Sequence, residues 1–383
     1  MDGFVPARVS DVVLAKVPQD FLTFIRDWGA FMTAEGNLVH WTREWTFTIV
    51  IGGVVLLFLL IKGLGLTIMG RWTPVAGNAN RPPDIIRCND SLWQFYSPPE
   101  GSKVAIDIIF FHGLQLGNFE NAFWTTWLAR NDETLVWPKE YLKNRYPAAR
   151  IFSVSYNSSV IRRDGQLDMY ALGENLVSDI ILNADLDIGT RPVILVGHSL
   201  GGLVIKQLII SAIQMKTKVE SPSRINAFLE NFKGVFYYAT PHQGSNIANL
   251  ARHIPLTSPI LELLKTLDTN RGRINADFMQ YRKQLKATAG AMAESLPTYY
   301  KLPYSIFGIS IGFGFTVVEE ASARHDIDAS NYYTGTESDH ITVCKAENER
   351  SSVVVKLTQF IATTLDARTL ADAEAPRDAV NLQ

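Results

Sequence analysis

The sequence predicts an α/β fold in which a mostly parallel sheet carries helices on both faces and is preceded by a single transmembrane helix. Three observations predict it. Short, nearly continuous apolar segments alternate with helical segments over residues 103–366, as in a parallel sheet buried on both sides. A Gly-x-Ser-x-Gly motif, Gly197–Gly201, joins one such segment to a helix. The run from Trp45 to Ile61 contains no charged residue.

The composition excludes several classes of protein. The 383 residues include 36 Lys and Arg against 38 Asp and Glu, and no basic patch interrupts this balance, so we expect no nucleic acid partner. Cys88 and Cys344 lie too far apart in the sequence to indicate a disulfide framework or zinc-ligand spacing. Neither a cluster of metal-ligating residues nor a Gly-rich phosphate loop is found, so we expect no metal and no cofactor.

The N-terminal part of the chain predicts attachment to a membrane. Residues 1–45 form a segment in which apolar residues from Phe21 to Met32 recur at helical spacing, and this amphipathic helix would lie on a membrane, a partner or the protein's own domain. Residues 46–69 are long enough to cross a bilayer as one helix if Lys62 reaches the headgroups. A small excess of Lys and Arg after this helix favours a cytosolic or matrix C-terminal domain.

The rest of the chain divides into a linker, a main domain and a tail. Proline-rich residues 70–102 predict the linker, residues 103–366 the main domain, and the polar, Ala-rich residues 367–383 a disordered tail. The expected strands of the main domain are residues 104–111, 150–156, 192–196, 234–239, 304–309 and 315–318. The expected helices are residues 119–130, 169–186, 200–216 and 351–365, with a mostly helical stretch that reaches residue 295.

The Gly-x-Ser-x-Gly motif predicts a catalytic nucleophile at Ser199. Between a strand and a helix, this motif forms a sharp turn that exposes the serine hydroxyl. The following helix points its N-terminus at the serine, so its positive dipole end and free N–H groups would stabilise an oxyanion, with the N–H of Leu200 as one donor.

The second oxyanion donor is expected in the loop after an earlier strand. His112-Gly113-Leu114 follows an apolar strand, which favours the N–H of Leu114 as this donor and gives His112 the task of holding the loop. His242 ends another strand, so it is expected to shape the rim of the pocket. We therefore assign His112, Gly113 and His242 to the substrate-binding region.

The base and its acid are expected later in the chain. This type of site orders its residues as serine, acid and histidine, with the histidine in a loop between the last strand and the final helix. His340 fits that place. Three carboxylates could orient its imidazole: Glu319, Glu320 and Asp339. Glu320 is favoured by a small margin.

Several blocks of the sequence occur in the order found in one protein family. They are FFHGL, WPKEYL, ARIFSVSY, RPVILVGHSLGGLVIK, GVFYYATPHQGS and VVEEASA…SDHITVCK…LTQFI. Together they resemble the serine-active-site-containing (SERAC-type), lipase-like family of α/β-hydrolases over about residues 104–365. The resemblance implies an α/β-hydrolase fold with Ser199 as nucleophile and His340 as base. One branch of the family is linked to phosphatidylglycerol remodelling and sterol handling near mitochondria–ER contacts, which implies a mitochondrial or endoplasmic reticulum membrane.

The sequence departs from the family pattern where the acid is expected. Family members typically end the penultimate strand in an aromatic residue followed closely by Glu, whereas here Phe307 is followed by Gly308, Ile309 and Ser310. They also tend to carry Glu-Ser-Ala after the last strand, whereas this chain has Ala321-Ser322-Ala323 with Glu320 one place early. Both departures affect the acid and neither affects the nucleophile.

Three functional hypotheses follow. The first is a membrane-anchored serine hydrolase or acyltransferase of lipase or esterase type, which acts on acyl esters such as phospholipids through Ser199 and His340. The second is a catalytically impaired, membrane-anchored pseudoenzyme that binds lipid or protein, and the unidentified acid motivates it. The third is hydrolysis of a protein thioester or a lipid-linked protein ester.

Overall fold

The computed structural model describes residues 66–68, 81–114, 119–156, 169–242, 258–306, 309–327 and 329–374. The chain divides into two units, Met1–Leu66 and Thr67–Gln383, and the described residues after Leu66 belong to the second unit. The first described element is a short strand, β1 (Leu66–Ile68).

The second unit contains an eight-stranded sheet with the order β2-β3-β5-β4-β6-β7-β8-β11. The strands from β5 to β11 in this order are parallel, whereas β3 pairs antiparallel with both β5 and β2. Their bounds are β2 (Ile86–Arg87), β3 (Leu92–Tyr96), β4 (Ile106–Phe111), β5 (Ala149–Val154), β6 (Val193–His198), β7 (Phe232–Tyr238), β8 (Thr288–Ala293) and β11 (Tyr332–Thr334). The carboxyl ends of the parallel strands meet at one edge, where ligands bind in open α/β sheets.

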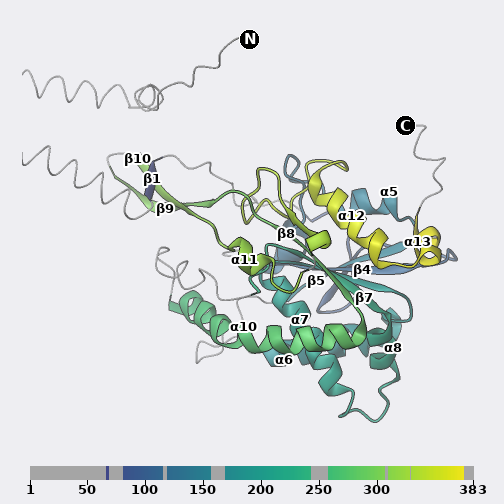
Figure 1. Cartoon of the computed structure of the whole chain (residues 1–383). Coiled ribbons are helices and arrows are strands. Elements are labelled where there is room, and N and C mark those ends of the chain that lie inside the picture. The colour runs from purple at the N-terminus through teal and green to yellow at the C-terminus, as the bar shows by residue number, and fades with distance from the viewer. Residues whose placement is uncertain are drawn as a thin grey trace, which may run out of the picture. The chain divides into compact units, whose positions relative to one another are not determined.

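Helices cover both faces of this sheet (Figure 1). One face carries α6 (Met169–Leu176), α7 (Leu200–Met215), α8 (Ser223–Asn231) and α10 (Ser258–Leu285). The other carries α5 (Lys143–Arg145), α12 (Ser352–Thr364) and α13 (Ala367–Ala373). The shorter elements are η1 (Phe119–Asn121), α4 (Ala122–Thr125), η2 (Pro138–Leu142), η3 (Val177–Ile181), η4 (Ala184–Leu186), α11 (Glu320–Ala323) and η5 (Ala329–Asn331).

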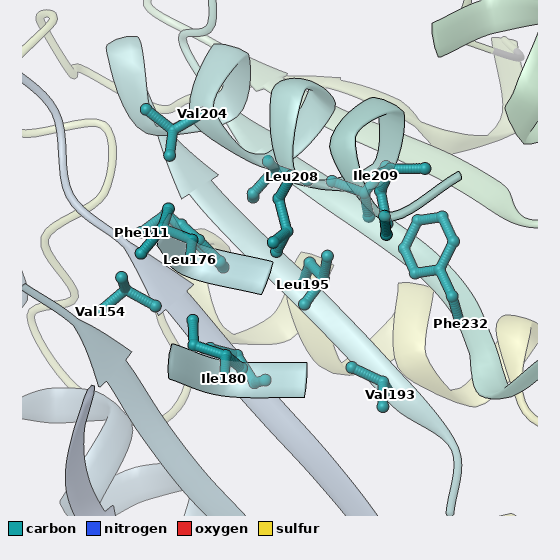
Figure 2. Packing of buried hydrophobic residues seen from close by; sticks show 14 of the residues in the cluster. Phe111, Val154, Leu176, Ile180, Val193, Leu195, Val204, Leu208, Ile209 and Phe232 are labelled. Carbon is teal, nitrogen blue, oxygen red and sulfur yellow. The ribbon is translucent and has the colours of Figure 1, made fainter. Parts of the chain in front are cut away.

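The core consists of two apolar layers, one on each side of the sheet. Successive residues of β6 alternate between them, because side chains of a strand point to opposite faces in turn. Val193 and Leu195 pack with Val204 and Leu208 of α7, as Figure 2 shows. Ile194 and Val196 pack in the other layer. This burial on both faces explains why β6 is an unbroken apolar segment, and it holds the residue that follows the strand in a fixed place.

Much of the expected element order is confirmed. The strands expected at 104–111, 150–156, 192–196 and 234–239 correspond to β4, β5, β6 and β7. The helices expected at 169–186, 200–216 and 351–365 correspond to α6 with η3 and η4, α7, and α12. The helix expected at 119–130 was wrong in extent, because only η1 and α4 are helical there.

The last two strands of the sheet were predicted wrongly. The penultimate strand is β8, which lies inside the stretch expected to be helical, and the last is β11. Of the two expected strands, residues 304–306, 309 and 315 instead belong to an antiparallel hairpin of β9 (Thr298–Ile306) and β10 (Ile309–Phe315) outside the main sheet, and residues 316–318 follow it; residues 307 and 308 lie outside the described residues. The alanines of β8 favour a helix, but its glycine is explained by space: a Cβ on Gly290 would lie 2.7 Å from Phe360 and 2.9 Å from Phe236.

Two of the predicted boundaries were also wrong. Residues 70–102 are not only a linker, because β2 and β3 belong to the main sheet and Leu92 and Phe95 are buried. Residues 367–373 are not a disordered tail but helix α13, whose N-terminus is capped by the Asp366 side chain, which accepts hydrogen bonds from two backbone N–H groups. Residues 375–383 lie outside the described residues.

The predicted membrane helix falls mainly outside the described residues. Residues 46–65 and 69 are not described, nor is the amphipathic segment from Phe21 to Met32. At the end of the predicted span, Leu66–Ile68 form a strand and not a helix. No helix among the described residues is long and apolar enough to span a membrane.

Candidate active site

Ser199 occupies the turn between β6 and α7. Its backbone has φ 51° and ψ −121°, a strained conformation for a residue with a side chain. The turn is held by two backbone hydrogen bonds: the Ser199 N–H donates to the carbonyl of Tyr238 at 2.9 Å, and the N–H of Gly202 donates to the Ser199 carbonyl at 3.1 Å. A Cβ on Gly201 would lie 2.2 Å from the Phe111 carbonyl oxygen, so only glycine allows α7 to begin this close to β4. The predicted nucleophile turn is therefore present.

His340 lies within hydrogen-bond distance of the serine. Its Nε2 is 2.8 Å from the Ser199 Oγ, although 141 residues separate the two in the sequence. The histidine is in the loop between β11 and α12, as the sequence predicted. Its backbone is held on both sides: the His340 N–H donates to Thr298 Oγ1 at 2.9 Å, and the His340 carbonyl accepts from His198 Nε2 at 2.8 Å.

The carboxylate that contacts His340 is Glu294, which the sequence analysis did not consider. Glu294 Oε2 lies 3.1 Å from His340 Nδ1, and the Glu294 side chain is 0% exposed. Its other oxygen, Oε1, accepts a hydrogen bond of 2.8 Å from the backbone N–H of Val318. Because a carboxylate only accepts, His340 Nδ1 carries the hydrogen and Nε2 is left to accept the serine proton.

The prediction that Glu320 is the acid was therefore wrong, because Glu294 contacts His340 instead. Glu320 is the first residue of α11 and is exposed, and Glu319 before it is exposed as well. Asp339 caps its own loop: its Oδ1 accepts hydrogen bonds from the backbone N–H groups of Ile341 and Thr342 and from the Thr342 hydroxyl.

Glu294 was missed because the strand before it was not recognised. The acid follows the penultimate strand of the sheet, as expected, but that strand is β8 and not residues 304–309. A signal was available in Ala289-Gly-Ala-Met-Ala293, a short uncharged run that begins after Thr288 and stops at the carboxylate of Glu294. The departure noted at Phe307 lies outside the described residues, and the acid is supplied by another segment of the chain.

The loop His112-Gly113-Leu114 lies against the nucleophile. A Cβ built on Gly113 would lie 3.0 Å from the Ser199 Cβ and 2.8 Å from His198 Nδ1. The loop follows β4, and Leu200 is the first residue of α7, so the two predicted oxyanion donors come from segments adjacent to Ser199. Their roles as donors stay predictions.

His112 holds this loop, as the sequence analysis expected. Its Nδ1–H donates to the Gly113 carbonyl at 2.8 Å, its ring stacks on Tyr156 with centroids 4.1 Å apart, and the Tyr156 hydroxyl donates to the His112 carbonyl. Burial lowers the pKa of His112 to about 4, so the ring is neutral near pH 7. Because its side chain is buried, direct contact between His112 and a substrate stays a prediction.

His242 is buried and is bound to a buried lysine. Lys206 Nζ lies 2.7 Å from His242 Nδ1 and donates to Asn275 Oδ1 at 2.6 Å, between the rings of Tyr237 and Phe278. Burial lowers the pKa of Lys206 to about 7. The structure thus places His242 in an internal polar cluster, and a role at the pocket rim stays a prediction.

The arrangement is able to support acyl transfer. A serine hydroxyl is hydrogen-bonded to an imidazole, and the imidazole is oriented by a buried carboxylate, which is the sequence of contacts that activates a serine nucleophile. Among the described residues, no group of three or more His, Cys, Asp or Glu side chains is placed to hold a metal ion.

The strand order, the strained serine turn and the Ser–His–Glu contacts define a class: a serine hydrolase with a lipase- or esterase-like α/β-hydrolase fold. Residues 108–270 match the "putative serine esterase" family, DUF676. The chain is 27% identical over 282 residues to the human protein SERAC1 and 26% identical over 287 residues to SERAC1 of Danio rerio. By these matches the chain is similar to putative serine esterases and to the SERAC1 proteins.

The coverage of these relatives is partial. The match includes 68% of this chain and 39% of the human protein, so the chain spans about two fifths of the length of the curated relatives it matches. Among solved structures, Bacillus licheniformis lipase BlEst2 in mature form is similar with a TM-score of 0.41 and 18% identity, over 71% of this chain and 97% of that chain. The fold assignment rests on the strand order itself.

Proposed function

We propose that this protein is a membrane-anchored serine hydrolase of lipase or esterase type that cleaves acyl esters. The observation that carries the proposal is the chain of contacts from Ser199 through His340 to Glu294 at the carboxyl end of the sheet. The contacts join residues from three distant parts of the sequence in the order that acyl transfer requires.

The reaction would proceed in two halves. Ser199 Oγ attacks the acyl carbonyl carbon while His340 Nε2 takes the hydroxyl proton, and the backbone N–H groups of Leu200 and Leu114 bind the oxyanion. The C–O bond to the alcohol then breaks, and His340 returns the proton to the leaving oxygen. Water attacks the acyl-enzyme in hydrolysis, or a second alcohol in transfer, with His340 again as base. Glu294 stabilises the imidazolium in both halves.

A lipid substrate at a membrane is part of the proposal. The uncharged run before the domain supports a membrane anchor, and an anchored site would remain close to an acyl lipid such as a phospholipid. A mitochondrial or endoplasmic reticulum membrane follows only from the resemblance of the sequence blocks. Carbonate extraction of the full chain tests the anchor: the protein should stay in the membrane pellet, and a Leu57→Arg variant should be released.

The reason for the pseudoenzyme alternative no longer applies. It was based on a missing acid, and Glu294 occupies the place where that acid is needed. Hydrolysis of a thioester or a protein-linked ester would use the same serine and histidine, so only a comparison of substrates separates it from the leading proposal.

A fluorophosphonate probe tests the proposal directly. The detergent-solubilised full chain should be labelled, the Ser199→Ala variant should not be labelled, and His340→Ala should be labelled much more slowly. A folded wild-type protein that remains unlabelled would refute the proposal. For labelled protein, p-nitrophenyl esters of increasing chain length, phospholipid vesicles and acyl thioesters, offered in parallel, identify the substrate class.

A further inference from the structure

The imidazole of His198 lies beside the proposed nucleophile but has no role in the mechanism above. His198 is the last residue of β6 and is buried, and its Nε2 lies 2.8 Å from the backbone carbonyl of His340. The two imidazole rings are 5.2 Å apart and tilted by 43°, so they do not stack. The contact between the two residues therefore runs from a side chain to a backbone.

The chemistry of this contact fixes the tautomer of His198. A carbonyl oxygen only accepts, so His198 Nε2 carries the hydrogen and Nδ1 carries a lone pair. Burial, and then the charge of His340, lowers the pKa of His198 to about 3, so the ring remains neutral throughout the range in which a serine hydrolase works. The donor consequently persists whether or not His340 is protonated.

Two side chains together hold the backbone of His340. His198 donates to its carbonyl, and Thr298 accepts from its N–H at 2.9 Å. Both act on the peptide groups and leave the imidazole to Ser199 and Glu294. The position of the base can therefore be held without interference with its proton transfers.

The contact also closes a short ring around the reacting atoms. His198 and Ser199 are adjacent in the chain, His198 binds the His340 backbone, and the His340 imidazole binds the Ser199 hydroxyl. On its other side, the His198 ring lies close to Gly113: a Cβ built on Gly113 would be 2.8 Å from His198 Nδ1. A movement of His198 would therefore change the distance between the serine and its base.

We propose that His198 is a positioning residue that ties the His340 loop to the strand carrying Ser199 and so sets the Oγ–Nε2 distance. This inference rests on the proposed serine hydrolase mechanism. It assigns to His198 a role in the rate of acyl transfer that is separable from its contribution to folding.

Three substitutions at one position test this role. His198→Leu removes the donor at similar volume. His198→Gln places an amide nitrogen at about the reach of the original Nε2, whereas His198→Asn places it one bond shorter, near the original Nδ1. Thr288→Val is the matched control, because it removes a hydrogen bond to Thr364 at the opposite end of β8.

The measurements use the detergent-solubilised full chain, with p-nitrophenyl butyrate turnover and the rate of fluorophosphonate labelling recorded from pH 5 to 10. A base displaced by about 1 Å costs roughly 10²-fold, so kcat of His198→Leu should fall by about that factor, with KM within about threefold of wild type. Wild-type rates should reach a plateau at the upper end of this pH range, because a side-chain base takes the serine proton. Rates of His198→Leu should continue to rise with pH, because hydroxide then replaces the displaced base. His198→Gln should restore both the rate and the plateau, and Thr288→Val should retain them.

The outcomes separate the possible failures. The positioning role would be overturned if the pH–rate profile of His198→Leu kept the wild-type plateau and its rates fell only in proportion to the folded fraction, measured by thermal unfolding. That result would leave the proposed function intact. If His198→Leu does not fold, the Gln and Asn variants decide: equal rates in the two would overturn the inference, and a slow Asn variant beside a fast Gln variant would support it. Absence of labelling in the wild type overturns the proposed function and this inference with it.

Discussion

Replacement of Glu294 by glutamine should abolish most of the activity although the side chain keeps its shape. The reason lies in the second oxygen of the carboxylate. The backbone N–H of Val318 donates to Oε1 at 2.8 Å, so a glutamine must direct its carbonyl oxygen to Val318 and its NH₂ group to His340. His340 Nδ1 must then accept, its Nε2 carries the hydrogen, and the imidazole cannot take the proton of Ser199.

The size of the effect follows from the distance between the two charges. At 3.1 Å and an effective dielectric constant of about 20, a carboxylate stabilises an imidazolium by about 5 kcal/mol. At about 1.4 kcal/mol per tenfold change in rate, this corresponds to a loss of ~10⁴-fold in kcat. The same estimate applies to the turnover of any acyl ester, because the charge forms on His340 whichever acyl group is transferred.

The assay compares Glu294→Gln with Glu320→Gln by p-nitrophenyl butyrate turnover, with thermal unfolding as a check on folding. The Glu320 variant should retain kcat within about twofold, because that side chain is exposed at the start of α11 and a surface change has little effect. A folded Glu294→Gln protein that retains a tenth of the wild-type kcat would refute the assignment of the acid. A large loss in Glu320→Gln would refute it as well.

Three further predictions concern the surroundings of the site. Gly113→Ala should lower kcat by about 10²-fold, measured with the same ester, since the new methyl group would be 3.0 Å from the Ser199 Cβ; an unchanged rate would contradict the close approach. Burial lowers the pKa of Lys206 to about 7 from an ordinary value of 10.5, so between these pH values the unfolded chain binds a proton that the folded chain lacks, and stability should rise with pH. The free energy of unfolding, measured with urea across this pH range, should rise by a few kcal/mol in the wild type and not in Lys206→Met. The same pH dependence in both proteins would contradict the prediction. Burial raises the pKa of Cys344 to about 12, so its thiol should react with a disulfide reagent only after unfolding, whereas reaction in the native protein would contradict its burial.

The nucleophile and base were predictable because their signals are local. Gly197 and Gly201 frame Ser199 within five residues, and the strand and helix on either side have clear apolar periodicity. His340 was found by its order in the chain, between the last strand and the final helix. For Ser199 the residues that form the motif are its neighbours in the sequence, whereas His340 is identified by its place in the order of the elements.

The acid depended on recognising β8, whose local pattern, a short uncharged run that stops at Glu294, is also compatible with a helix. β8 is a strand because it pairs with β7 from Gly234–Thr288 to Tyr238–Met292, and Gly290 leaves room for the rings of Phe236 and Phe360. The preference of alanine for helices points the other way, and tertiary packing overrides it. The same lesson applies at His198 and Thr298, whose contacts with the His340 backbone span 142 and 42 residues.

The segment that contains the β9–β10 hairpin contacts the site at both of its ends. Thr298, its first residue, binds the backbone of the base, and Val318, three residues after its last, binds the acid. The described residues between these two anchors lie outside the main sheet. Chimeric proteins that exchange this segment should therefore place their junctions inside Thr298 and Val318. An exchange that retains both anchors should keep the contacts of Thr298 with His340 and of Val318 with Glu294, and with them the placement of the base and the acid.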